Sequence, residues 1–250
     1  IANVASTTAF TISCSNATAN ASDNFVVNIN SIPAVPTNLS PTGNIRVNPT
    51  FSAIVSDPNT GQTVSAVFHI IGGIDYPGTS VVNTGGTSTA TATLADGSYT
   101  YYAWAVDSMA AVSANTAIYT FTKDTIAPIA DIQYAEGTIT TTSIPITLIE
   151  TDERTGVVTG TAITQVSING GAFSTINTGV SNFTYTGVNG NTYIFRYTVY
   201  DGAGNTATDT GGAVTINMPI YADIDAGPVG GPYTDGPYAA IAGATVSLNW

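Results

Sequence analysis

The feature that most constrains this sequence is an alternation of apolar and polar side chains with a period of two residues. The pattern is clear in residues 51–56, 144–149 and 192–199, where every second residue is apolar. Residues two apart lie on the same face of a strand, so the pattern predicts strands with one buried face. These runs are rich in Thr, Val, Ile and Tyr, which strands favour. No stretch combines an apolar helical stripe with helix start and stop signals. We therefore predict an all-β fold.

Turn-forming residues divide these runs at regular intervals. Clusters of Gly, Asn, Asp and Pro recur about every 8–15 residues, which is typical of short antiparallel strands packed as a sandwich. The clusters lie at residues 57–61, 72–73, 85–86, 96–97, 169–171 and 201–205.

The chain also repeats itself. Residues 51–57 align with 146–152, an offset of 95, and residues 97–107 align with 191–201, an offset of 94. A period of this size matches one sandwich of roughly seven strands and about 100 residues. We therefore predict two complete tandem β-sandwiches, in residues 33–123 and 124–218.

The two ends are too short to form sandwiches of their own. Residues 1–32 are predicted to be the final hairpin of a preceding domain, with strands at 9–14 and 25–29 joined by a polar loop. Residues 219–250 are predicted to be the first strands of a further domain. An isolated strand pair leaves an apolar face uncovered. Either the sequence is a window from a longer chain, or neighbouring subunits cover the ends; we expect the first.

The composition excludes several classes of partner. The chain has 4 Lys and Arg against 16 Asp and Glu, a formal net charge of −12. Nucleic acids and anionic membrane surfaces require a basic face, so neither is an expected partner. No apolar run approaches the roughly 18 residues of a membrane span, so direct membrane insertion is not expected. A surface rich in Thr, Ser, Asn and Gly instead favours an exported, extracellular protein.

Residues for enzymatic chemistry are scarce. The single histidine, His69, lies within a predicted strand, and the single cysteine, Cys14, excludes an intrachain disulfide. The adjacent carboxylates of Asp152 and Glu153 would need a substrate cleft to hydrolyse a glycoside. We therefore expect no enzymatic activity.

Several segments resemble known extracellular repeats. Residues 94–107 resemble a corner and the following strand of fibronectin type III-like domains, in which a Leu precedes by five residues a Tyr whose hydroxyl bonds to the backbone; these are Leu94 and Tyr99 here. Residues 124–218 resemble the bacterial and archaeal immunoglobulin-like repeats of giant surface proteins, and residues 222–248 resemble the first strands of a PKD-type domain. The pieces that carry the immunoglobulin-like resemblance are residues 124–128, 167–171 and 197–205. The resemblance implies tandem immunoglobulin-like and fibronectin type III-like sandwiches from a large surface protein.

Carboxylates in loops predict a calcium site. In a sandwich of this type, the loops after the second and sixth strands lie at the pole where the first strand enters. Calcium takes about six to eight oxygen ligands, which such loops can supply. The alternative is that Asp and Asn serve only as turn formers. The predicted ligands are Asp124, Asp152, Glu153, Asp201 and Asn205, with a second set one repeat earlier at Asp57, Asn59 and Asp107.

Four Asn-x-Ser/Thr sequences are predicted glycosylation sites: Asn16, Asn20, Asn38 and Asn182. The proline after Asn48 disqualifies a fifth match.

The function favoured by these patterns is structural. We expect a segment of an S-layer or filament-forming protein, whose partners are neighbouring copies of itself or further domains of the same chain. A second interpretation is the stalk of an adhesin. A third is a carbohydrate-binding accessory module of a secreted hydrolase, which would need an exposed aromatic platform; Tyr101, Tyr102 and Trp104 place at least one aromatic ring outward on a single strand.

Overall fold

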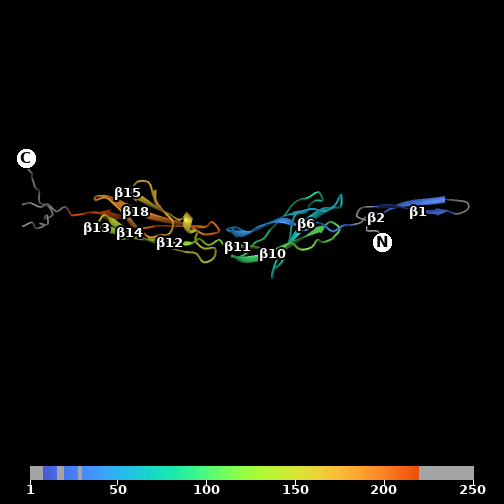
Figure 1. Cartoon of the computed structure of the whole chain (residues 1–250), viewed down its shortest axis with the longest axis horizontal. Coiled ribbons are helices and arrows are strands. Elements are labelled where there is room, and N and C mark those ends of the chain that lie inside the picture. The colour runs from blue at the N-terminus through green and yellow to red at the C-terminus, as the bar shows by residue number, and fades with distance from the viewer. Residues whose placement is uncertain (1–7, 16–19, 28–29, 220–250) are drawn as a thin grey trace, which may run out of the picture. The chain divides into compact units, whose positions relative to one another are not determined.

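A computed structural model describes residues 8–15, 20–27 and 30–219. Apart from one turn of 3₁₀ helix, Thr159–Thr161, the regular elements of these residues are β-strands (Figure 1). The predicted all-β fold of tandem sandwiches is confirmed. Within the same residues, no helix is long and apolar enough to cross a membrane.

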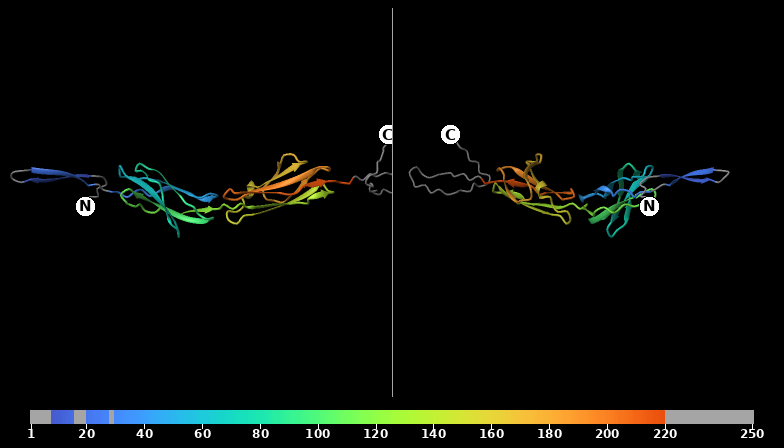
Figure 2. Two further views of the ribbon diagram at one scale, coloured as in Figure 1. Left: turned by 180° about the vertical axis from the view of Figure 1, so that it is seen from behind. Right: turned by 45° about the vertical axis from the view of Figure 1, so that its right-hand side comes forward.

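Residue contacts divide the chain into two compact units. The first unit comprises Ile1–Ala127 together with two loops, Asp152–Gly156 and Asp201–Asn205. The second comprises Pro128–Thr151, Val157–Tyr200 and Thr206–Trp250. Apart from the paired strands Thr8–Ser15 and Asn20–Val27 of the first unit, the strands of each unit lie in two layers, which Figure 2 shows from two further directions.

The first sandwich packs a three-stranded sheet against a larger one. The smaller sheet has the order β3-β5-β9, and the larger has the order β4-β11-β10-β6-β7, with β8 also paired to β6. Their bounds are β3 Thr37–Ser40, β4 Gly43–Ile45, β5 Thr50–Val55, β6 Thr63–Ile70, β7 Asp75–Pro77, β8 Val81–Val82, β9 Gly86–Thr91, β10 Gly97–Asp107 and β11 Tyr119–Lys123.

An aromatic cluster joins these two sheets. Phe51 of β5 is fully buried, and its ring lies 5.4 Å from that of Phe68 on β6 and 5.0 Å from that of Tyr101 on β10. The Phe121 ring of β11 completes the cluster, 5.9 Å from Phe51. Each of these residues occupies an inward position of an alternating strand, so the period of two in the sequence places them in the core.

The second sandwich repeats this arrangement. One sheet has the order β12-β14-β17, and the other has the order β13-β20-β18-β15-β16, with β19 also paired to β18. Their bounds are β12 Ile129–Gln133, β13 Gly137–Ile139, β14 Ser143–Thr151, β15 Ile163–Ile168, β16 Ser174–Thr178, β17 Phe183–Thr186, β18 Thr192–Tyr200, β19 Thr206–Thr210 and β20 Val214–Ile216.

The two sandwiches share one topology. In each, the opening segment contributes one strand to the smaller sheet and then a short strand to the larger sheet, where it pairs in parallel with the last strand (β4 with β11, β13 with β20). Two facing sheets connected in this way form an immunoglobulin-type sandwich. Tyr99 on β10 and Tyr193 on β18 occupy equivalent strands.

An antiparallel hairpin precedes the first sandwich. Strands β1 (Thr8–Ser15) and β2 (Asn20–Val27) pair from Thr8↔Val27 to Ser15↔Asn20. The predicted polar loop at 15–23 is therefore wrong in its second half, because Asn20 to Asp23 lie in β2. Backbone pairing with β1 does not require apolar side chains, so the polar composition obscured this part of the strand. The strands predicted after residue 219 lie outside the described residues.

The hydroxyls of the two equivalent tyrosines bond to the backbone of the preceding loop. The Tyr99 hydroxyl donates to Ala95 O at 2.8 Å, as the resemblance implied, and the Tyr193 hydroxyl accepts from Val188 N at 2.6 Å. Each bond therefore fastens the start of a central strand to the loop before it.

We expect Tyr99→Phe to lower the free energy of unfolding by about 1 kcal/mol, because it removes one hydrogen bond, and Tyr193→Phe to lower it by at least as much, because it removes the bonds with Val188 N, Val188 O and the Asn191 amide. Urea denaturation of the full chain measures this change. Tyr102→Phe is the matched control, because Tyr102 lies on the same strand as Tyr99 but on its outward face. Its free energy of unfolding should stay within about 0.5 kcal/mol of wild type. Equal losses in all three variants would contradict the assignment.

Candidate metal centre

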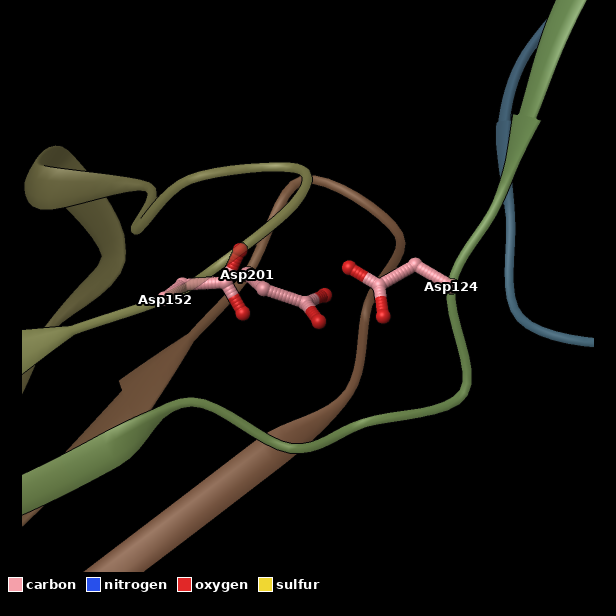
Figure 3. Close-up of side chains that lie close together, drawn as sticks. All are labelled: Asp124, Asp152 and Asp201. Carbon is pink, nitrogen blue, oxygen red and sulfur yellow. The ribbon is translucent and has the colours of Figure 1, made fainter. Parts of the chain in front are cut away.

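Three aspartates from separate parts of the chain converge. Asp124 follows β11, Asp152 follows β14 and Asp201 follows β18. One carboxylate oxygen from each lies within 4.8 Å of the others, and the three side chains point toward one another (Figure 3). All three aspartates belong to the first compact unit.

The loops that carry Asp152 and Asp201 fold around these same side chains. Asp152 Oδ2 accepts N–H bonds from the backbone of residues 154, 155 and 156, at 3.1, 2.8 and 2.6 Å. Asp201 Oδ1 accepts bonds from Ala203 N and Asn205 N, at 2.9 and 2.8 Å. These are the bonds of turn-forming aspartates. They leave Asp152 Oδ1 without a donor among the described residues.

Asp124 and Asn205 connect the two loops. Asp124 Oδ2 accepts the Thr155 hydroxyl at 2.9 Å, and Asp124 Oδ1 accepts Ile126 N at 3.1 Å. The Asn205 amide nitrogen donates both to Asp201 Oδ2, at 2.7 Å, and to Asp124 O, at 2.9 Å. The predicted ligands Asp124, Asp152, Asp201 and Asn205 are thus brought together. Glu153 is exposed and is not part of the cluster.

The electrostatics of this cluster are unfavourable without a cation. Asp124 is 0% exposed and Asp201 is 2% exposed. At an effective dielectric constant of 20, two unit charges 4.8 Å apart repel by about 3.5 kcal/mol. The two ion pairs of the described residues, His69–Asp75 and Lys123–Asp96, both lie elsewhere. A hard divalent cation with oxygen ligands would offset the repulsion, and carboxylates on flexible loops suit calcium.

The second predicted set lies in a different network. Asp57 and Asp107 are each 5% exposed. Asn59 N donates to Asp57 Oδ1 at 2.7 Å, and Asn59 Oδ1 accepts Ser31 N at 2.9 Å. Asp107 Oδ2 accepts the Asn30 amide at 2.8 Å.

Sequence reasoning missed Asn30 and its partner Gln62, whose amide nitrogen donates to Asn30 Oδ1 at 2.8 Å. A signal for Asn30 was present, because it lies 94 residues before Asp124, the offset of the repeat. The neutral amide concealed it from a search for acidic ligands.

The predicted glycosylation sites differ in their setting. Asn38 and Asn182 are exposed, and Asn182 Oδ1 also accepts Leu148 N at 2.8 Å. Asn20 begins β2, and Asn16 lies outside the described residues.

The aromatic residues of β10 divide between its two faces. Tyr101 is buried, whereas Tyr102 and Trp104 lie half-buried on the opposite face beside His69 of the adjacent strand. The Tyr102 and Trp104 rings are 5.9 Å apart and tilted by 39°, and His69 is 5.0 Å from Tyr102. His69 Nδ1 also lies 2.6 Å from Asp75 Oδ1.

Comparison with known proteins gives similarities at the level of structure. No family model and no curated protein sequence matches this chain. Fibronectin(III)-like modules of CbhA from Clostridium thermocellum are 13% identical, with a TM-score of 0.41, and the match covers 75% of this chain and 95% of that one. The FN1–FN3 domains of chicken CNTN1 are 10% identical, with a TM-score of 0.37 and coverage of 78% and 71%. Dimeric latent PorU from Porphyromonas gingivalis is 14% identical, with a TM-score of 0.28; the match covers 79% of this chain and 23% of PorU.

The residue before Asp124, Lys123, is the only lysine of the sequence, and its hydrogen-bond partners are not among the three aspartates. Lys123 Nζ donates to Leu94 O at 2.9 Å and to Asp96 Oδ1 at 3.1 Å. Asp96 Oδ2 accepts the backbone N–H and the hydroxyl of Thr125, at 2.9 and 2.8 Å. The backbone bond from Thr125, followed by its hydroxyl bond and by Lys123, lowers the pKa of Asp96 to about 2.

We expect the Asp96 carboxylate, with its partners Lys123 and Thr125, to make the free energy of unfolding depend on pH below about pH 4. Because the pKa of Asp96 is lower in the folded chain than its ordinary value of 3.8, its contribution is present above about pH 4 and is lost as pH falls toward 2. Thermal melts of the full chain between pH 2 and pH 5 measure this dependence. Asp96→Asn should flatten the curve in that window, and Thr125→Val, which removes only the hydroxyl donor, should give an intermediate slope. An unchanged slope in Asp96→Asn would rule out this role.

Proposed function

We propose that this chain is a structural segment of a large extracellular surface protein of the S-layer or filament-forming type, and that it acts without catalysis. The observation that carries the proposal is the tandem repetition of one sandwich topology in two consecutive stretches of the chain. Repeats of this kind supply length and rigidity, and their function is contact with further domains or with neighbouring copies of the chain.

The interior of each sandwich supports a mechanical role. Phe51 connects the two sheets of the first sandwich through four aromatic neighbours. In the second, Phe195 packs edge-on against Tyr134 and Tyr185, at 4.9 and 5.2 Å. Such aromatic pairs add about 0.5–1.5 kcal/mol each beyond their buried area. Shape is thus maintained by dense cores.

Calcium is the second part of the proposal. Asp124, Asp152 and Asp201 would bind the ion through carboxylate oxygens, and Asn205 would position Asp124 and Asp201 through its amide. The ion would fasten the segment that follows β11 to two loops that lie far away in the sequence. The separation of the carboxylates and the burial of Asp124 and Asp201 support this assignment.

Two other functions are compatible with tandem sandwiches: an adhesin stalk and a carbohydrate-binding module. An adhesin stalk would use the repeats in the same way and would differ only in a binding tip elsewhere. A carbohydrate-binding module needs a flat, exposed aromatic platform, but Tyr102, Trp104 and His69 are half-buried and tilted against one another by 39–44°. The structural role is therefore favoured over sugar binding.

Removal of calcium should destabilise the full chain. With free calcium at about 100 times its dissociation constant, binding contributes about 2.7 kcal/mol, and a chelator removes this contribution. Differential scanning calorimetry should show a lower melting temperature with chelator in wild type. Asp152→Ala and Asp201→Ala should no longer respond, while Glu153→Ala, at the exposed neighbouring position, should respond like wild type. A wild-type melt that does not change on chelation would refute the calcium proposal.

Assembly should require the ends of the chain. We expect residues 33–218 alone to be monomeric by light scattering, because both complete sandwiches are retained and the partial segments at the two ends are removed. The full 250-residue chain should associate with itself or have ends that proteases cleave readily. If the two proteins are equally monomeric and equally resistant to protease, the assembly proposal fails.

A further inference from the structure

Two buried oxygen atoms in the first sandwich lack any hydrogen-bond donor. They are Asp57 Oδ2 and Gln62 Oε1. Only three side-chain atoms of the described residues are in this condition, and two of them belong to this one network. Burial of an unpaired oxygen is costly, particularly on a carboxylate. Because both atoms are acceptors, a cation or a hydrogen-bond donor would satisfy them and an anion would not; the two carboxylates of the network favour a cation.

Hydrogen bonds connect these two residues to Asp107. Gln62 donates to Asn30 Oδ1, and Asn30 donates to Asp107 Oδ2, both at 2.8 Å. Asp57 is connected through Asn59, whose side chain accepts the backbone N–H of the residue after Asn30. Asp57, Gln62 and Asp107 therefore surround the same short segment, and both carboxylates are 5% exposed.

The network occupies the position in the first repeat that the three-aspartate cluster occupies in the second. Asn30 and Asp107 lie 94 residues before Asp124 and Asp201, and Asp57 lies 95 residues before Asp152. The local bonding agrees, since Asp107 Oδ1 accepts N–H bonds from the residues two and four positions later, at 2.9 and 2.8 Å, as Asp201 Oδ1 does. The difference is one charge, because Asn30 stands where the second repeat has Asp124.

We propose that Asp57, Gln62 and Asp107 form a second calcium site, in which Asp57 Oδ2 and Gln62 Oε1 are ligands and Asn30 takes the place of a third carboxylate. The inference extends the proposed calcium function but rests on different residues. Calcium affinity rises with the number of charged ligands. The site with two carboxylates should therefore bind calcium more weakly than the site with three. As the calcium concentration rises, the second repeat should bind its ion before the first repeat does.

Calcium titration of the full chain by isothermal calorimetry tests the inference. Wild type should bind two ions with different affinities. Asp57→Asn, which retains the acceptor for Asn59 N, should abolish the weaker event alone, and Asp152→Asn should abolish the tighter event alone. Asn30→Asp restores the third carboxylate, so it should tighten the weaker event by roughly tenfold. This gain does not depend on a damaged variant remaining folded.

The outcomes separate the two sites. One ion in wild type, lost in Asp152→Asn and retained in Asp57→Asn, would overturn the second site and leave the first. One ion lost only in Asp57→Asn would support the second site and refute the three-aspartate site. No bound ion would refute both. Two ions in wild type with no change of affinity in Asn30→Asp would overturn the proposed role of Asn30 and the site built around it.

Discussion

The packing of two sheets through their apolar faces is the constraint on which the rest of the structure depends. Phe51 of one sheet packs against Phe68 and Tyr101 of the other, and this contact fixes how the two sheets face each other. Each strand continues as long as every second side chain can enter this core. The same holds for Phe195 in the second sandwich. A shift of one residue would turn every core side chain outward, so the core also determines where each loop begins.

The acidic clusters follow from those loop positions. Asp107 ends β10, Asp152 and Asp201 come directly after β14 and β18, and Asp57 lies two residues beyond β5. The sandwich topology brings the ends of these strands together. The chain has few cations, and Lys123 is already paired with Asp96. Buried carboxylates are therefore left with backbone N–H groups, hydroxyls and amides as partners, which satisfy hydrogen bonding without neutralising charge. This imbalance is the physical argument for a cation.

The two repeats resolve the same problem differently. The second keeps three carboxylates within 4.8 Å of one another. The first replaces one carboxylate by the amide of Asn30, which donates directly to Asp107. The amide bond supports the loops without a cation, whereas the three carboxylates of the second repeat repel one another, which is the repulsion that we propose calcium offsets.

The sequence by itself determined the all-β fold, the tandem sandwiches and the carboxylates nearest to each candidate site, because the period of two and the repeat offset are local patterns. It also identified Tyr99 and Tyr193 as equivalent. Only the tertiary structure showed that Glu153 is exposed while Asp124 is buried, since that depends on how separate loops meet. The start of β2 at Asn20 was missed because backbone pairing does not require apolar residues. Gln62 was recognised only in three dimensions, and the repeat offset that marked Asn30 acquired meaning only there, because a neutral amide becomes a candidate ligand neighbour when folding places it in a network with the unpaired carboxylate oxygen of Asp57.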